Sequence, residues 1–359
     1  MTAHATASVR SAAREAIITR AIQEVDYFRR SPSRIGGPSA HKEWQHFLVH
    51  AHGVDVVLNF NLIDDRWMDD HADREVHRLI FLVRTGGSWR GGVERFERSE
   101  VALRSGEIGA RFGESTLAFN DGHYRASIRL RDSPIAADLT FAPLALPLFV
   151  QSQPLCPGRS MSYVLVPRLL CRGHVTIEGE QVEIDSAPAY HDHNWGCFQW
   201  GEDFSWEWGA AQPVSPDCPW SIVYAHMLDR RHLVSRRCGL FVWEDARLQR
   251  VFRDDEIRVY SEGRLERTPL VQIPPVMRLL GGGLRDVPAR VELSARDHSD
   301  ALELAFEASD VFQLILPNDR DIDGVTVLNE VTGRVSARGR VGAARVEWDG
   351  PGAFEFLRS

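Results

Sequence analysis

The sequence lacks several features that would assign it to a common class of protein. It has no apolar run approaching the about 20 residues that a membrane-spanning helix requires, and its N-terminus has no apolar core of a secretory signal. Basic residues are outnumbered, with 42 Lys and Arg against 50 Asp and Glu, for a net charge of -8. A nucleic-acid-binding domain is expected to carry a basic stripe, so this composition argues against that function. We therefore expect a cytoplasmic protein without a transmembrane segment.

Cysteine is scarce, and the five cysteines show neither a C-x-x-C pair nor zinc-ligand spacing. An odd number without such spacing fits a reducing compartment better than a disulfide framework. The sequence also lacks a G-x-S-x-G nucleophile elbow, an H-E-x-x-H zinc motif and a phosphate-binding glycine loop. We expect no nucleotide, flavin or other cofactor.

A chain of 359 residues exceeds the size at which single hydrophobic cores stop growing, so two domains are expected. Ser8 to Arg30 has the spacing of an amphipathic helix, which we expect to pack on its own domain, although transient contact with a membrane surface is an alternative. Ser31 to Ala40 is predicted to be a linker, because it is rich in Ser, Pro and Gly. The predicted division is a helix and linker at 1–40, then domains at 41–200 and 201–359.

The rest of the chain consists of many short apolar or alternating runs separated by turn residues, which is typical of a β-sandwich or barrel. Regular helical patterns do not separate these runs, so a parallel βαβ sheet is not expected. Ala142 to Arg159 contains four prolines and is predicted to be a long crossing loop. Thr268 to Gly283, with its Pro and Gly runs, is predicted to be a second loop.

The most distinctive segment is Tyr190-His191-Asp192-His193-Asn194-Trp195-Gly196, which we call the YHDHNWG motif. Six of the ten tryptophans lie between Trp195 and Trp243, so this is the densest aromatic region of the chain.

The motif resembles the signature of the carotenoid 1,2-hydratase (hydroxyneurosporene synthase) family and its lipocalin-like relatives. Glu43-Trp44, at the start of the first predicted strand, is similar to an acidic-Trp pair of that superfamily, and Gly106 to Phe141 has the expected strand–turn–strand texture. The resemblance implies an all-β fold of two tandem lipocalin-like antiparallel barrels with an N-terminal helix. It also implies addition of water to an isoprenoid double bond without a cofactor. Related proteins include cyclases and pericyclases, so the fold does not fix the reaction.

In a strand, side chains alternate between the two faces of the sheet, so two functional interpretations of the motif compete. In the first, Asp192 is the general acid that protonates an alkene, kept protonated by burial and held by Tyr190 and Asn194 on the same face. Aromatic rings would stabilise the resulting carbocation. The candidate substrate-binding residues are His191, His193, Trp195, Trp206, Trp208, Tyr224, His226, Tyr163 and Glu43.

In the second interpretation, His191 and His193 bind a metal together with His50 and His52. A purely structural role for Asp192, hydrogen-bonded at a domain junction, is a further alternative. The first interpretation predicts acid-catalysed addition to an alkene of a hydrophobic isoprenoid or polyene. Two other functions remain open, namely an intramolecular cyclase or pericyclase and a non-enzymatic carrier of lipophilic ligands.

Overall fold

The computed structural model describes residues 2–29, 41–64, 75–104, 106–200, 203–215, 217–265, 271–273, 286–317 and 324–358. The linker predicted for Ser31–Ala40 and most of the loop predicted for Thr268–Gly283 lie outside these residues. The chain divides into two compact units. Unit 1 comprises Met1–Val83, Val93–Ser152 and Met161–Cys197, and unit 2 comprises Arg84–Gly92, Gln153–Ser160 and Phe198–Ser359. The domain boundaries near residues 40 and 200 stay a prediction.

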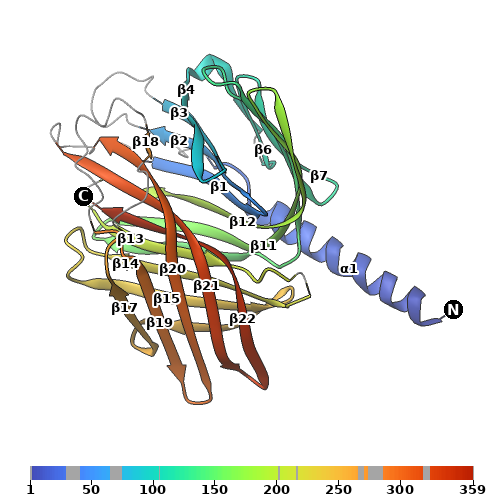
Figure 1. Cartoon of the computed structure of the whole chain (residues 1–359), viewed down its shortest axis with the longest axis vertical. Helices are drawn as coiled ribbons and strands as arrows, with labels where there is room; N and C mark the ends of the chain where they lie inside the picture. The colour runs from blue at the N-terminus through green and yellow to red at the C-terminus, as the bar shows by residue number, and fades with distance from the viewer. Residues whose placement is uncertain are drawn as a thin grey trace. The chain divides into compact units, whose positions relative to one another are not determined.

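A twelve-stranded sheet supplies most of unit 1 (Figure 1). Strand β1 pairs antiparallel with β2 on one side and with β12 on the other. In spatial order the strands are β4 (Ser88–Phe96), β3 (Glu75–Thr85), β2 (Val54–Asp64), β1 (His41–Ala51), β12 (Glu180–Cys197), β11 (Arg159–Ile177), β9 (Ile135–Pro143), β8 (His123–Arg129), β7 (Ser115–Asn120), β6 (Gly109–Phe112) and β5 (Val101–Leu103), with β10 (Leu148–Cys156) paired to β11. A single 3-10 turn, η1 (Arg98–Glu100), joins β4 to β5.

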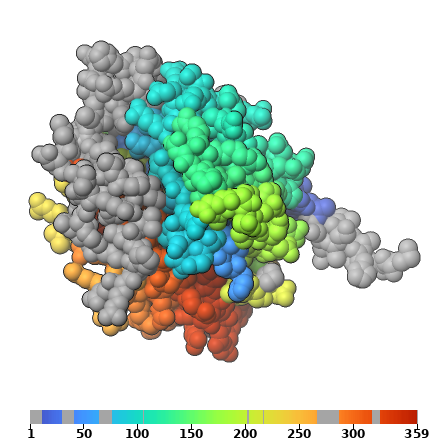
Figure 2. Space-filling view, turned by 45° about the horizontal axis from the view of Figure 1, so that its top comes forward, coloured from blue at the N-terminus to red at the C-terminus, as the bar shows by residue number. Residues whose placement is uncertain are grey.

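This sheet curls into a nearly closed barrel around aromatic side chains. The Phe112 ring on β6 packs edge-on against Phe60 on β2, His77 on β3 and Phe96 on β4. These contacts bring the strands near one end of the sheet onto those near the other end. Burial alternates along β7, β8 and β9, as expected for strands with one face in a core, and their outer side chains form the green surface in Figure 2.

Helix α1 (Thr2–Val25) packs on this same barrel. Ile18 and Ile22 are buried, and the guanidinium of Arg14 donates to the Leu144 carbonyl at 3.0 Å. A side chain at Gly122, in the β7–β8 turn, would meet Thr19 of the helix. The predicted N-terminal helix is therefore confirmed, and it lies on its own unit. Among the described residues, no helix has the length and apolarity needed to cross a bilayer.

A ten-stranded sheet forms unit 2. Its long strands β20, β21 and β22 form two successive antiparallel hairpins. In spatial order the strands are β16 (Arg247–Arg253), β15 (Ser235–Glu244), β14 (Trp220–Leu228), β13 (Ser205–Ala211), β22 (Ala344–Arg358), β21 (Val325–Val341), β20 (Asp300–Pro317), β19 (Arg290–Asp297) and β17 (Ile257–Glu262), with β18 (Val271–Ile273) paired in parallel to β20.

The two ends of this second sheet also meet. The Arg250 guanidinium on edge strand β16 bonds to the carboxylate of Asp297, at the β19–β20 turn, and lies 3.3 Å from Glu256 in the 3-10 turn η2 (Asp254–Glu256). Inside, Phe306 and Phe354 stack with ring centroids 4.2 Å apart. The all-β fold predicted from the sequence is confirmed in both units.

One sequence prediction about strands is corrected. The crossing loop predicted for Ala142–Arg159 contains strand β10, which tolerates its proline because it lies off the main strand path of the sheet. Strand β11 continues through Gly173, which adopts a φ of +134° and lets β9 approach closely. A Cβ at this position would lie 2.0 Å from the Asp138 carbonyl oxygen.

Candidate active site

The YHDHNWG motif lies on β12, directly paired with β1. Asp192 is the cross-strand partner of His46, and His193 that of Gln45. The predicted alternation of faces is observed, since the Asn194 amide donates to the Asp192 carboxylate while the rings of His193 and Trp195 lie together on the other face.

Asp26, directly after α1, is the centre of a buried polar network on the histidine face of β12. Its carboxylate is bonded by His191 Nε2 at 3.0 Å, by His193 Nδ1 at 2.8 Å and by the Tyr124 hydroxyl at 2.5 Å. Burial alone would raise the pKa of Asp26, but the hydrogen bonds and charges of the two histidines outweigh it and hold the pKa well below its usual range. Asp26 is therefore an ionised anchor rather than a proton donor.

The network continues from His193 to Glu43 and His41. His193 Nε2 lies 2.9 Å from Glu43 Oε1, and His41 Nε2 lies 3.2 Å from Glu43 Oε2. The Arg29 backbone amide also donates to Glu43 at 2.7 Å. Despite burial, these two histidines lower the pKa of Glu43 to about 2, and the pKa of His193 is raised by its two carboxylate partners. The predicted residues His191, His193 and Glu43 are thus brought together in one hydrogen-bonded set.

This geometry argues against His191 and His193 as metal ligands. Both ring nitrogens of His191 have partners, since Nδ1 lies 2.9 Å from the His46 carbonyl oxygen and Nε2 bonds Asp26. Both ring nitrogens of His193 are bonded to carboxylates. His50 Nδ1 lies 3.0 Å from Asp55. A histidine whose nitrogens are taken by carboxylates and carbonyls cannot offer them to a metal ion without breaking the network.

Trp195, at the end of the motif, is held by a cation. The Arg29 guanidinium carbon lies 3.5 Å from the Trp195 ring centroid, and Phe149 stacks on the same ring at 5.6 Å. Trp195 is half-buried, whereas Tyr163 on β11 is buried.

The opposite face of β12 carries Tyr190, Asp192 and Asn194, all buried. On β1 the same face carries His46, whose Nδ1 lies 3.4 Å from the Asn59 amide. Burial, together with the electrostatic effect of the neighbouring His191, lowers the pKa of His46 to about 3, so His46 is a neutral ring at pH 7. This face presents neutral hydrogen-bonding groups around the Asp192 carboxyl.

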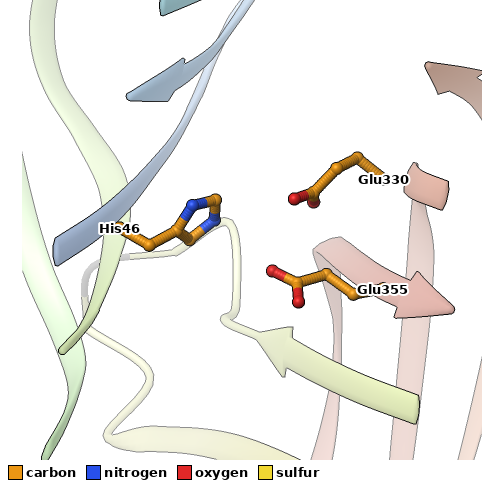
Figure 3. A group of neighbouring side chains, drawn as sticks. All are labelled: His46, Glu330 and Glu355. Atoms are coloured by element: carbon orange, nitrogen blue, oxygen red, sulfur yellow. The ribbon is translucent and has the colours of Figure 1, made fainter. Parts of the chain in front are cut away.

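Unit 2 contains a second candidate for acid chemistry, on the face of its sheet that bears Trp206 and Trp208. Glu355 on β22 is the cross-strand partner of both Trp208 and Glu330, so these three side chains share that face. The Trp206 Nε1–H donates to Glu355 Oε2 at 3.1 Å. The carboxyl groups of Glu330 and Glu355 lie beside one another (Figure 3) and are hydrogen-bonded. We call Glu330, Glu355, Trp206 and Trp208 the glutamate face.

The electrostatics of this pair favour a shared proton. Burial raises the pKa of Glu355 to about 7, although the hydrogen bonds from Trp206 and Glu330 lower it in part. Two carboxylates in hydrogen-bond contact cannot both ionise without strong repulsion, so one proton stays on the pair near neutral pH. Glu330 is buried while Glu355 keeps partial accessibility. Glu355 is therefore the member that can exchange a proton with another molecule.

Aromatic side chains continue the glutamate face on the next strand. Phe312 on β20 is the cross-strand partner of Glu330, and its ring packs against Trp89 at 4.7 Å. Asp310, two residues before Phe312, is paired with Arg84 at 2.5 Å. The carboxyl pair thus lies on a sheet surface that is largely aromatic.

The structure separates Tyr224 and His226 from the two tryptophans. Tyr224 is the cross-strand partner of Gly209, so it lies on the face opposite Trp206 and Trp208. The Tyr224 hydroxyl lies 3.1 Å from His226 Nδ1 and donates to Glu207 at 3.3 Å, as expected if these residues share a face. Arg358 and His226 outweigh burial and lower the pKa of Glu207 to about 2.

The sequence interpretation overlooked Asp26, Tyr124, Glu330 and Glu355. A signal for Glu355 exists, because its i-2 and i+2 neighbours, Ala353 and Leu357, are apolar, which places the carboxylate on a buried strand face. No comparable signal marks Asp26, whose partners lie about 100 to 170 positions later in the chain.

No family model matches the chain, and a search of curated proteins finds no match. Solved structures do resemble it. A protein assigned as AttH from Nitrosomonas europaea has a TM-score of 0.63 at 13% identity, covering 92% of this chain and 97% of that one. Kievitone hydratase from Nectria haematococca has a TM-score of 0.56 at 12% identity, covering 93% and 94%.

A third structure, CghA with Sch210972, has a TM-score of 0.59 at 12% identity and covers 89% of each chain. The likeness at these identities concerns the fold and does not extend to the carotenoid 1,2-hydratase family in particular. The chain therefore shares the lipocalin-like barrel fold of these three proteins.

Proposed function

We propose that this protein is an enzyme that protonates a carbon–carbon double bond of an apolar small molecule, with the Glu330–Glu355 pair as the proton donor. The observation that carries the proposal is the raised pKa of Glu355, which burial holds near 7 although hydrogen bonds from Trp206 and Glu330 offset part of the rise. A general acid is most effective when its pKa lies near the working pH. Glu355 meets that condition, whereas Asp26, Glu43 and Glu207 have lowered pKa values and stay ionised.

The tryptophans beside the pair support a carbocation mechanism. Protonation of an alkene leaves a cation, which indole faces stabilise by about 2 kcal/mol or more when water is excluded. Trp206 and Trp208 lie on the same face as Glu355, and Trp206 bonds it directly. Capture of the cation by water gives hydration, and capture by a second double bond gives a ring. Kievitone hydratase, by its name, adds water, which favours hydration as the outcome here.

Asp192 is the second candidate acid, in unit 1. It is buried, and the Asn194 amide donates to it, which fixes the position of the carboxyl as the sequence interpretation required. Its assignment, with Tyr190 and Asn194 as supporting residues, stays a prediction. Assigning the donor needs variants of both carboxyls.

Turnover in deuterated water tests the proposal. Purified protein is incubated with a panel of isoprenoid and polyene alkenes, including any molecule extracted from the denatured protein, and products are analysed by mass spectrometry. We expect a product that carries deuterium on carbon. Glu355→Gln should reduce its rate about 100-fold or more, because general acid catalysis contributes about 10²–10⁴. The matched variants are Asp192→Asn and Glu303→Gln, the latter an exposed glutamate of β20.

Each other outcome contradicts part of the proposal. Full activity of Glu355→Gln with loss in Asp192→Asn would transfer the acid role to Asp192. An isomeric product without deuterium would indicate a pericyclic enzyme, and return of every ligand unchanged would indicate a carrier.

A further inference from the structure

A cysteine, a histidine and a carboxylate are linked by hydrogen bonds where strands β1 and β12 pair in unit 1. None of the three is one of the proposed catalytic carboxyls. Cys197, the last residue of β12, is the direct cross-strand partner of His41, the first residue of β1. The His41 ring is hydrogen-bonded to the Cys197 thiol and, through Nε2, to Glu43 Oε2 at 3.2 Å. This is the order of a nucleophile, a base and a group that orients the base.

The three residues differ in exposure in the way a reactive thiol requires. Cys197 is exposed, whereas the side chains of His41 and Glu43 are 4% and 0% exposed. The thiol can therefore meet a molecule from solvent, while its partners are fixed within the fold. Glu43 is itself held by His193 and by the Arg29 amide, so it cannot rotate away from His41.

We propose that Cys197 is a covalent modification site for soft carbon electrophiles such as α,β-unsaturated carbonyl compounds, reacting as a thiolate paired with His41. Burial disfavours a charged His41, yet Cys197 and Glu43 outweigh this and raise its pKa to about 9. An imidazolium beside a thiol lowers the pKa of that thiol and increases the thiolate fraction. The charged groups linked to this pair by hydrogen bonds are Glu43, His193 and Asp26.

The addition needs no reactant besides the electrophile. The thiolate sulfur forms a bond to the β-carbon, and the π electrons move to the carbonyl to give an enolate. The enolate carbon takes the proton held by His41. The products are a thioether and a neutral imidazole.

The other cysteines provide an internal reference. Burial raises the pKa of Cys171 well above its usual range, and burial with the charge of Asp254 raises that of Cys238 to about 12. Cys156 is partly exposed, and burial together with the charge of Asp203 raises the pKa of its thiol. Cys156 is therefore a matched, accessible thiol, and no histidine among the described residues pairs with it.

The test is alkylation of the full-length protein by limiting N-ethylmaleimide from pH 5.5 to 9 (about the range in which thiols titrate), with the labelled site identified by peptide mass spectrometry. At pH 6 we expect Cys197 to react about tenfold or more faster than Cys156, since its thiolate fraction is larger. The His41→Gln variant should slow Cys197 about tenfold at pH 6. The control variant is His123→Gln, which replaces a histidine bonded to the Asp121 carbonyl oxygen. It should leave the rate at Cys197 unchanged.

A Cys197 rate that rises with pH in parallel with that of Cys156 would overturn the proposal, and so would an unchanged rate in folded His41→Gln. If His41→Gln does not fold, the pH profile of the unaltered protein decides alone. The alkylation experiment detects a chemical label on one residue, so its result does not depend on the proposed alkene protonation.

Discussion

Glu330 and Glu355 face each other on neighbouring strands, with their carboxyl groups hydrogen-bonded to one another. Such a contact between two acids is stable only while at least one is protonated, because two carboxylates at this separation repel strongly. The pair therefore links the stability of unit 2 to pH, and this link can be measured without a substrate.

Glu355→Gln should make the protein more stable at pH 8. The pKa of Glu355 is raised from 4.5 to about 7, so the folded state binds a proton that the unfolded state releases above pH 4.5. Stability is lost as pH rises from 4.5 through 7, by about 3 kcal/mol in total. Urea unfolding of both proteins at pH 5 and pH 8 measures the difference.

His41 contributes in the same direction at higher pH, since its raised pKa of about 9 removes stability as pH rises from 6.5 through 9. The quantity to compare is therefore the difference in free energy of unfolding between the unaltered protein and Glu355→Gln at each pH. A difference that does not change between pH 5 and pH 8 would show that the two carboxyls do not share a proton.

Trp206→Phe should raise the pKa of Glu355 further. The variant keeps an aromatic ring but removes the Nε1–H donor, which lies 3.1 Å from the Glu355 carboxylate and favours its ionised form. One hydrogen bond is worth about 1 kcal/mol, which corresponds to a shift of about 0.7 pKa units. Carboxyl-carbon NMR titration of labelled glutamate measures it. Trp348→Phe, in the same unit, is the control, and a fall in the pKa of Glu355 would contradict the prediction.

Asp26→Asn should destabilise unit 1 by about 3–5 kcal/mol, the typical cost of removing one partner of a buried ion pair. The carboxylate accepts bonds from His191, His193 and Tyr124, and an amide cannot satisfy all three. Denaturant unfolding at pH 7 measures the loss. The exposed Asp121, which also has a positive φ that Asn tolerates, provides the control Asp121→Asn, expected within about 0.5 kcal/mol. Equal effects of the two variants would contradict the anchoring role.

Glu207→Gln should cost about 3 kcal/mol of stability at pH 7 and almost nothing at pH 2. The folded pKa of Glu207 is lowered from 4.5 to about 2 by His226 and Arg358, which outweigh burial. Its contribution is therefore fully present above pH 4.5 and lost as pH falls through 2. Unfolding by urea at several pH values tests this. Glu262→Gln, on the exposed part of β17, should show no such dependence.

The all-β fold could be predicted from sequence because strands leave a local record in alternating residues and turn signals. The strand containing Ile135 to Pro143 alternates regularly, and the structure finds β9 at that place. Strand β10 leaves no such record, since the prolines in and around it resemble those of a loop and its pairing depends on a partner supplied by β11.

Less of the candidate site could be predicted, because the alternation along a strand shows which face a side chain lies on but not which distant residue it contacts. The alternation of Asp192 with His193 followed from strand geometry alone. The partners of His193, Asp26 and Glu43, come from segments 167 and 150 positions away, and no local pattern encodes that contact. For the same reason the sequence predicts one substrate-binding set containing both Trp206 and Tyr224, whereas β13 and β14 place these side chains on opposite faces.

Asp26 joins the end of α1 to a motif on β12 that follows it by 165 positions. Replacing Asp26 alone by an apolar residue would leave the two motif histidines without their shared buried carboxylate partner. Among sequences descended from a common ancestor with this chain, an apolar residue at position 26 should be accompanied by the loss of both motif histidines.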